Sequence, residues 1–586
     1  MNYMFGPLPG DAGTLFRLWA PSQEEVRLLL ENRDAIAMQK NTVGFWQAHV
    51  DNVSSGARYR FGIDGYEFPD PASREQETDA DGWSIVRGAS GRPPHPRPLR
   101  PWHQTILCEV HVGTVSPEGT FKGLMDRLEH FRDAGYTGLE IMPVNEFPGQ
   151  RGWGYDGTLI FAPDKSYGTP EDLRALVDRA HDIGLCIILD VVYNHFGETY
   201  NFIPRYAPEW FDRAAGTPWG PAIDVRQAAV RQFYYENACW WLQEYDVDGL
   251  RFDAVHEITT EARGHFLSGL AHAARSIKPD ANLIIENINN QMHWLLRDLD
   301  DKPVDYTAQW NDDFHHVLQF LLTGEERDGY EDDSRDPVAD FEKALADGFV
   351  HDGDAEGESD GRTRNEPASL LPMQAFISYL HNHDQIGNRP DGRRIVERVD
   401  ADRLDFAHFV ILLSPQIPLF FMGEEAHLRT PFMYFCDLPE PVGSQRRDDR
   451  YDQMEHMFNT KVDVGSLPDP QDPGTFERSH IDWDAYGREE HRNALERFRQ
   501  LTALRRELIW PLAATRCLSA RSARQGDAVI VTWQYEAGTY NMVLNPTSRE
   551  ATVELSLTGP AASTGRFEVR DGHIKISPWS ALVWKS

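Results

Sequence analysis

The sequence predicts three domains: a central (β/α)8 TIM barrel, an N-terminal β-sandwich and a C-terminal antiparallel β domain. The chain has 586 residues, which is too long for a single hydrophobic core. Apolar strand-like runs alternate with helix-like runs over about 400 residues, a pattern typical of parallel βαβ units. Shorter alternating runs precede and follow that region. A doubly wound sheet is the alternative for the centre, but polar groups at many separate strand ends favour the barrel.

We expect the N-terminal β-sandwich to occupy residues 1–92. Four runs there carry aromatic and branched residues and are separated by Gly, Asn or Asp. The proline-rich stretch 91–98 then marks a linker to the next domain. The predicted strands are Thr14–Ala20, Glu25–Leu30, Gly44–Val50 and Ala57–Ile63.

The barrel is expected to span residues 93–508, with insertions near 196–224 and 328–372. A helix near Arg492–Glu507 is expected to close it. The predicted barrel strands are Ile106–Val112, Gly138–Met142, Leu185–Val192, Val247–Phe252, Asn282–Ile285, Ala375–Leu380 and Ile417–Met422. The predicted helices between them are Phe121–Ala134, Glu171–Ile183, Val230–Tyr245 and Glu261–Ile277.

Residues 509–586 read as a separate antiparallel β domain. Four runs in it alternate between apolar and polar residues, which predicts half-buried strands. These runs are Ala528–Tyr535, Thr539–Leu544, Thr552–Leu557 and Ala581–Trp584.

The charge balance narrows the class of ligand. The chain has 58 Lys and Arg against 92 Asp and Glu, which gives a net charge of −34. Such a charge argues against nucleic acid and against anionic membranes as partners. A neutral ligand such as a sugar is compatible with it.

The cysteines are few and odd in number, and we expect them to be buried free thiols in a reducing compartment. The N-terminus has no basic and apolar signal pattern, and no run approaches roughly 18 uninterrupted apolar residues. We therefore expect a cytoplasmic protein. No cluster of Asp and Asn has the spacing of a calcium site, so we expect no metal and no cofactor. The cysteines are Cys108, Cys186, Cys239, Cys436 and Cys517.

Three carboxylates, Asp253, Glu286 and Asp384, each stand at the end of a strand-like stretch. Burying a carboxylate without a partner is costly, so packing alone does not explain them. Retaining glycoside hydrolysis needs two carboxyl groups roughly 5–5.5 Å apart, one ionised and one protonated. The sequence therefore predicts a site that cleaves a glycosidic bond.

The surroundings of the three carboxylates suggest separate roles. Arg251 lies two residues before Asp253, on the same side of a strand, and can hold it ionised for nucleophilic attack. Glu286 follows Leu-Ile-Ile with no adjacent cation, and we expect its raised pKa to suit an acid/base. We expect Asp384, beside His383, to stabilise positive charge in the transition state.

Several of these side chains have a structural alternative. Asp190 follows Ile-Ile-Leu and is explained about equally well as a structural cap. His195 and His383 could be core histidines with satisfied hydrogen bonds, the commoner fate of a lone histidine. For Glu424-Glu425 we favour a structural role, with salt bridges or hydrogen bonds at the barrel rim.

Four stretches resemble the signature regions of the α-amylase superfamily, in order: Asp190–His195, Gly249–His256, Glu286-Asn287 and His381–Asp384. The resemblance implies that Asp253 is the nucleophile, Glu286 the general acid/base and Asp384 the transition-state stabiliser. Asn194 occupies a position that many amylases use for calcium. The resemblance also implies that His195, Arg251 and His383 bind the sugar at the cleavage point, that Tyr155 is its aromatic platform, and that His256 faces the leaving group.

A narrower resemblance is carried by the segments Glu146–Gly157, Thr217–Ile223, Gln309–His316, His383–Arg389, Ser414–Glu425, Pro431–Asp437 and Thr475–Ser479. Over nearly the whole chain, the sequence resembles the maltooligosyltrehalose trehalohydrolases. This resemblance implies hydrolysis of the α-1,4 bond next to the terminal trehalose unit of maltooligosyltrehalose. Trp153 and Trp219 are candidate stacking platforms for the trehalose, with loop packing as the alternative. Gln385 and Arg389 are also expected to bind the substrate.

One segment departs from this pattern. Residues 349–367 are acidic and glycine-rich, where the resemblance implies an aromatic and arginine-rich stretch near the leaving group. This departure bears on the preference for trehalose or for chain length and not on the general mechanism. Two other functions stay open. One is another α-1,4-glucan enzyme of the superfamily, such as a branching enzyme or a glucanotransferase. The other is a non-catalytic glycan-binding protein built on a barrel.

Overall fold

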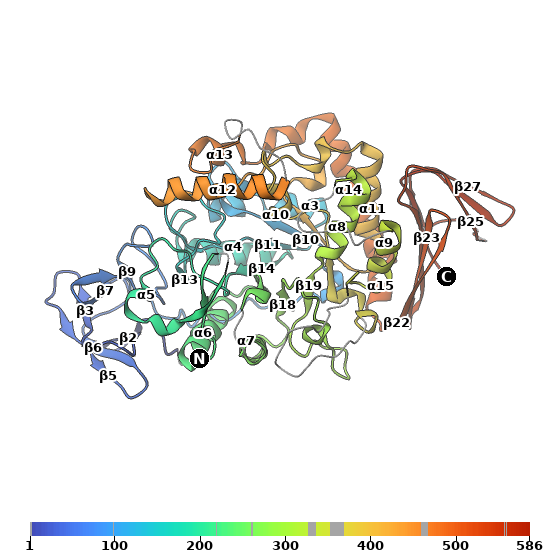
Figure 1. Ribbon diagram of the computed structural model, residues 1–586. Coiled ribbons are helices and arrows are strands. Elements are labelled where there is room, and N and C mark those ends of the chain that lie inside the picture. The colour runs from blue at the N-terminus through green and yellow to red at the C-terminus, as the bar shows by residue number, and fades with distance from the viewer. Residues whose placement is uncertain are drawn as a thin grey trace.

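The computed structural model describes residues 3–97, 99–217, 219–258, 262–325, 336–351, 368–458, 467–555, 557 and 559–586. Much of the expected insertion 328–372, including most of the acidic segment 349–367, lies outside these residues. Figure 1 shows the N-terminal β domain at one end, the barrel in the middle and the C-terminal sheets at the other end. The expected fold class is confirmed.

Eight parallel strands form a closed barrel. Leu107 of the first strand pairs with Leu419 of the last and so closes the ring. Every residue in these strands is buried, because the barrel interior covers one face and the surrounding helices cover the other. In order, the strands are β10 (Leu107–Val110), β11 (Gly138–Ile141), β14 (Cys186–Val191), β17 (Gly249–Phe252), β18 (Asn282–Ile285), β19 (Ala308–Trp310), β20 (Phe376–Ser378) and β21 (Ile417–Phe421).

The helices pack around the barrel. α4 (Pro170–Asp182) begins with a capping box between Thr169 and Asp172, and it buries Leu173 and Leu176 on one face. The expected single helix over 121–134 is two helices, which meet at Arg127, where the backbone N–H bonds to the Leu124 carbonyl three residues back rather than four. The helices of the barrel domain also include α2 (Phe121–Met125), α3 (Leu128–Ala134), α6 (Ala228–Glu244), α7 (Arg263–Ile277), α8 (Asp312–Thr323), α9 (Pro337–Ala346), α11 (Ala401–Leu413) and α14 (Glu489–Leu508).

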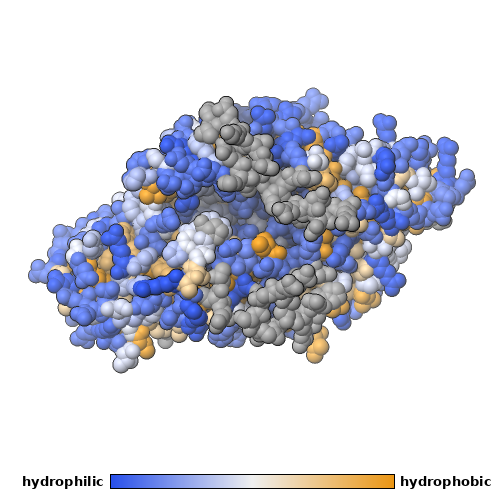
Figure 2. Space-filling view, in the orientation of Figure 1, coloured by the Kyte–Doolittle hydropathy of each residue, from blue (hydrophilic) through white to orange (hydrophobic). Residues whose placement is uncertain are grey.

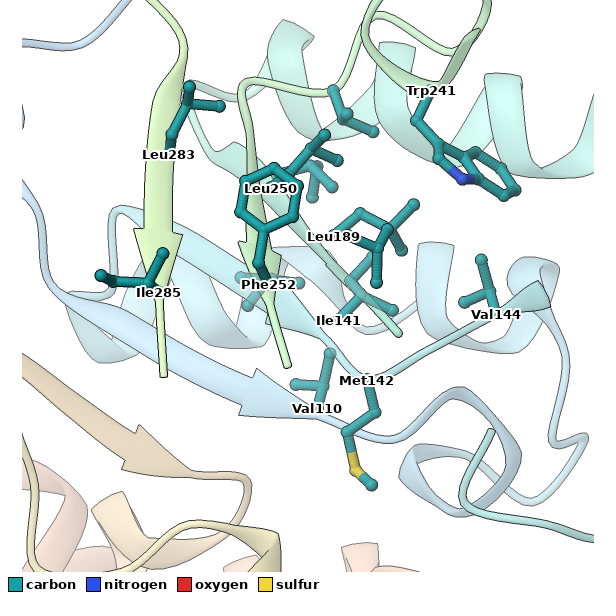
Figure 3. Packing of buried hydrophobic residues seen from close by; sticks show 14 of the residues in the cluster. Val110, Ile141, Met142, Val144, Leu189, Trp241, Leu250, Phe252, Leu283 and Ile285 are labelled. Carbon is teal, nitrogen blue, oxygen red and sulfur yellow. The ribbon is translucent and has the colours of Figure 1, made fainter. Parts of the chain in front are cut away.

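Side chains alternate between two layers along each strand. Figure 3 shows the outer layer, in which Leu250 and Leu189 lie between Ile285 on one side and Trp241 of α6 on the other. A second buried cluster, which includes Leu107 and Ile188, comes from alternate positions of the strands and belongs to the interior. Side chains two residues after the members of this cluster also point inward, and they lie at the C-terminal ends of the strands.

The N-terminal domain has two small antiparallel sheets. Their main strands are β2 (Gly13–Trp19), β6 (Phe45–Asp51), β3 (Arg27–Leu30) and β7 (Arg58–Ile63), as expected within two residues. The backbone N–H groups of Met4 and Phe5 donate to Glu236 of α6, at 2.7 and 3.0 Å. These bonds dock the domain on the barrel.

The C-terminal domain has a five-stranded antiparallel sheet with the order β22 (Cys517–Gln525), β23 (Ala528–Tyr535), β24 (Gly538–Asn545), β29 (Ser580–Lys585) and β26 (Ala562–Thr564). A three-stranded sheet, β25 (Ala551–Glu554), β28 (His573–Ile576) and β27 (Phe567–Arg570), packs beside it. The indole of Trp533 donates to the Leu345 carbonyl of the barrel at 3.2 Å.

Two segments between strands bear on the site. Within 196–224 the chain forms a hairpin, β15 (Phe211–Thr217) and β16 (Gly220–Ile223). After β21, the chain makes a long excursion that contains α12 (Val442–Phe458), which lies across the barrel in Figure 1.

Figure 2 shows a face that is largely hydrophilic. Among the described residues, no helix combines the length and the apolar character that a membrane span requires. All five cysteines are free, and four are buried; Cys517 is half-buried, which corrects the expectation for that residue.

Candidate active site

Arg251 of β17 is the centre of the site. Its side chain has no exposed surface, and its guanidinium lies 4.0 Å above the ring of Trp310. Nη1 donates to Asp190 at 2.6 Å and to Asp253 at 2.9 Å, and Nη2 pairs with Glu286. One buried cation therefore contacts three carboxylates, which lie at or just after the C-terminal ends of three neighbouring strands.

The expectation that no cation lies beside Glu286 is wrong. The parallel register places Arg251 opposite Ile284, two residues before Glu286, so both side chains point to the same side of the sheet. The backbone N–H of Ala254 also donates to Glu286, at 3.1 Å. The surrounding of Glu286 is therefore not purely apolar, and it does not by itself identify Glu286 as an acid/base.

Asn194 is a partner of Asp253 that the sequence analysis did not identify. Its amide Nδ2 donates to Asp253 Oδ2 at 2.8 Å and to the Asp253 carbonyl at 3.0 Å. Asp253 thus receives donors from two side chains, Arg251 and Asn194. An ionised carboxylate, which only accepts hydrogen bonds, fits this position.

Asp190 supports Arg251 and Tyr155. The Tyr155 hydroxyl donates to Asp190 Oδ2 at 2.7 Å. Burial raises the pKa of Asp190 to about 7, although the charge of Arg251 opposes the shift. These contacts replace the structural cap that we considered for Asp190.

Glu109 of β10 holds His383. The His383 imidazole meets Glu109 Oε1 at 2.6 Å, and its backbone N–H donates to Oε2 at 2.8 Å. Burial lowers the pKa of His383, but the charges of Glu109 and Asp384 outweigh it, and the pKa is raised to about 9. The imidazole also stacks on Tyr155, with the ring centres 5.0 Å apart. The sequence analysis did not identify Glu109, whose only signal is a carboxylate inside an apolar strand.

Asp384 lies apart from the Arg251 cluster. Its side chain is 42% exposed, against 12% for Asp253 and 16% for Glu286. Asn388 Nδ2 donates to Asp384 Oδ1 at 3.2 Å, and His383 Nε2 lies 3.5 Å from the same oxygen. Asp384 is therefore the most open of the three expected carboxylates.

The aromatic residues divide into buried and open ones. Trp219, at the turn of the β15–β16 hairpin, is 39% exposed and stacks on His195 with the ring centres 5.0 Å apart. Trp153 is buried, donates to the Met433 carbonyl and stacks on Phe432. This burial contradicts our expectation that Trp153 offers an open face to a sugar, because neighbouring side chains cover it.

His195 fits a neutral sugar-binding group. Its Nε2 lies 3.1 Å from the Tyr155 carbonyl, and its Nδ1 contacts Asn194. Burial lowers the pKa of His195, and the charge of Asp253 opposes that shift. The structure therefore brings His195, Tyr155 and Asp253 together.

The other expected substrate-binding residues have structural partners. The Gln385 side chain accepts from the Asn382 N–H at 2.8 Å and so caps α10 (His383–Gly387). Arg389 pairs with Glu325 at 3.2 Å. His256 lies in the short turn after Asp253, half-buried, with Nε2 3.8 Å from Glu257.

The segment Gln309–His316 contributes two groups that the sequence analysis did not single out. Trp310 supports the guanidinium of Arg251. Asp312 begins α8, accepts from the Tyr379 hydroxyl and lies near Glu286; burial first, and then the charge of Glu286, raise its pKa to about 7.

Glu424 and Glu425 have structural roles, as expected. His130 Nε2 contacts Glu425 at 3.0 Å, and His408 Nε2 contacts Glu424 at 3.3 Å. Among the described residues, no group of three or more His, Cys, Asp or Glu side chains is arranged to hold a metal ion.

Comparisons with known proteins agree with this architecture. Residues 4–84 match carbohydrate-binding module 48 (isoamylase N-terminal domain), and residues 71–215 match the α-amylase catalytic domain. The malto-oligosyltrehalose trehalohydrolase of Saccharolobus solfataricus is 35% identical over 88% of this chain and 89% of the relative. The enzyme of that name from Rhizobium sp. is 33% identical over 98% of each chain.

This chain belongs to the malto-oligosyltrehalose trehalohydrolase family. Among solved structures, a putative α-amylase from Salmonella typhimurium has a TM-score of 0.92 and 34% identity, with both chains fully covered. A pullulanase from Anoxybacillus complexed with maltotetraose has a TM-score of 0.71 at 17% identity, and shares the fold.

Proposed function

We propose that this trehalohydrolase-family chain is a retaining glycoside hydrolase that cleaves the α-1,4 bond next to the terminal trehalose unit of maltooligosyltrehalose and releases trehalose. The observation that carries the proposal is the buried Arg251, which gathers Asp253 and Glu286 around one guanidinium. Two carboxylates so close together suit the double displacement of a retaining enzyme.

In the first step, an Asp253 oxygen attacks the anomeric carbon while Glu286 gives its proton to the departing oxygen of trehalose. A covalent glycosyl–Asp253 ester forms and the C–O bond to trehalose breaks. In the second step, Glu286 takes a proton from water, and the resulting hydroxide displaces Asp253.

The remaining groups bind and orient the sugar. Asp384 faces the positive charge that develops at the anomeric centre, and Tyr155 and His383 form a stacked pair beside it. Trp219 is an exposed aromatic ring at the site and offers a face to the C–H side of a sugar, with His195 behind it.

Product analysis tests the proposal. We expect maltooligosyltrehalose to give free trehalose and a maltooligosaccharide, and maltopentaose to be cleaved much less. New α-1,6 branches would instead identify a branching enzyme, and longer maltodextrins a glucanotransferase.

The alternative of a non-catalytic glycan-binding protein is tested with a variant. Asp253→Ala should still bind the substrate in calorimetry but lose turnover, since the nucleophile is gone. If the variant behaved like the wild-type protein in every assay, a scaffold function would be the better explanation.

We also propose a cytoplasmic location. Five free cysteines, of which four are buried, are compatible with a reducing compartment. Fractionation of cells that produce the protein, with an antibody as the probe, tests this proposal.

A further inference from the structure

Helix α12 reaches the candidate site from outside the barrel wall. Arg446 and Arg450 are four residues apart and therefore lie on one face of the helix. Arg446 pairs at 3.3 Å with Asp156, the residue after Tyr155. Arg450 contacts the other side of the site, next to Asp384. One helix face thus touches two segments that carry expected site residues.

Arg450 is linked to Asp384 through Asn388. Its Nη1 donates to Asn388 Oδ1 at 2.7 Å, and its Nη2 donates to the Gly387 carbonyl at 2.7 Å. Asn388 Nδ2 in turn donates to Asp384 Oδ1 at 3.2 Å. Because a guanidinium can only donate, it fixes the Asn388 amide with its oxygen toward Arg450 and its NH2 group toward Asp384.

The guanidinium itself is well supported. It lies 4.9 Å from the ring centre of Tyr434, and Nη1 also reaches the side chain of Gln453 at 2.8 Å. Burial lowers the pKa of Arg450 to about 10, so the group stays charged at neutral pH. Its orientation is therefore fixed before any sugar binds.

Asp384 depends on this support. In the described part of the chain, the side chains that contact its carboxylate are those of His383 and Asn388. The buried Arg251 does not contact it. Without an oriented Asn388, a carboxylate that is 42% exposed is free to turn toward solvent.

We propose that Arg450 is a positioning residue that holds Asp384 in its working orientation through Asn388. The proposal rests on the proposed function, because it takes Asp384 as the stabiliser of the transition state. Misplacing such a group by about 1 Å can cost on the order of 100-fold in rate.

The experiment compares Arg450→Ala with Arg447→Ala, which removes a half-exposed arginine of the same helix that pairs loosely with Asp469. We expect Arg450→Ala to lower kcat by about 10- to 100-fold with little change in KM, because the loss falls on the transition state. Arg447→Ala should keep both constants. Arg450→Gln, which keeps most of the side chain's volume, serves if the alanine variant fails to fold.

Two further readouts separate positioning from a merely structural role. Added guanidinium at millimolar concentration should restore part of the kcat of Arg450→Ala. The double variant Arg450→Ala/Asp384→Asn should be no slower than Asp384→Asn alone, since Arg450 acts through Asp384. An unchanged kcat in Arg450→Ala, or a further multiplicative loss in the double variant, overturns the proposal.

Rates are measured as new reducing ends from whichever α-1,4-glucan the wild-type protein cleaves. Failure of the proposed function would then appear separately, as an absence of trehalose among the wild-type products. An active Asp384→Asn variant would refute the role of Asp384 and the role of Arg450 together.

Discussion

The two halves of the candidate site are built differently. Asp253 and Glu286 share a cation that is fully buried in the barrel wall. Asp384 is held by groups at the barrel mouth, one of which is oriented by α12. Two carboxylates held by one buried cation therefore contrast with a third carboxylate, whose support comes in part from outside the barrel. In the proposed mechanism Asp253 and Glu286 carry out the bond cleavage. The orientation of Asp384 can be changed by residues outside the barrel strands.

The strongest test of this comparison removes the cation. Arg251→Met leaves three carboxylates near one another without a counterion, and breaking such a buried pair costs about 3–5 kcal/mol. We expect the free energy of unfolding in urea to fall by that amount, with loss of turnover. Arg393→Met, which removes an exposed ion pair with Asp391, should change stability by less than about 1 kcal/mol. A stable and active Arg251→Met variant would show that Asp253 and Glu286 do not depend on the buried cation.

The second test concerns the acid/base. Glu286→Gln keeps the shape of the side chain but cannot give up a proton, so kcat should fall by about 10²–10⁴-fold. Calorimetry should show that maltooligosyltrehalose still binds. Turnover close to that of the wild-type protein would show that Glu286 is not the acid/base.

The third test uses pH and the ion pair at the barrel mouth. The pKa of His383 rises from an ordinary 6.5 to about 9 in the folded protein, against the effect of burial, because of the charges of Glu109 and Asp384. The pair therefore stabilises the fold fully below about pH 6.5 and stops doing so as the pH rises through 9. We expect the free energy of unfolding to fall by on the order of 3 kcal/mol over that interval.

The matched variant for this titration is Glu109→Gln, in which His383 has lost its nearer anionic partner and keeps Asp384, 3.5 Å away. Its stability should depend less on pH between 6.5 and 9. An equally steep curve would assign the titration to another group.

The smallest expected effect is that of Trp219→Ala. One open stacking face is worth about 0.5–1.5 kcal/mol, so KM should rise by about two- to tenfold while kcat changes little. Phe202→Ala, which changes an aromatic ring packed on Phe68 instead, is the control. A loss confined to kcat would place Trp219 among the groups that act in the transition state.

Local sequence patterns predicted most of the strands and helices of the barrel. They failed for elements whose structure depends on contacts with distant residues. Most strands were found as apolar runs, but β19 is three residues long and contains Gln309, so its pattern was too short to recognise. α12 was missed because Val442–Phe458 is polar around most of its circumference.

The site was predictable to a similar degree. The three carboxylates were found from their positions after strand-like runs. The contact between Arg251 and Glu286 depends on the register of two strands whose residues are 35 positions apart, which no local pattern contains. The contacts of Glu109 and Arg450 join still more distant segments.

The pair between Glu109 and His383 also has a consequence for how the protein is made. The two residues are 274 positions apart, so a ribosome working at about 5–20 residues per second delivers His383 roughly 14–55 s after Glu109. During that interval the nascent barrel is open, and the Glu109 carboxylate has no counterion to be buried with. Closure is therefore a late event, and the unfinished barrel is the stage at which a chaperone would find exposed strand edges.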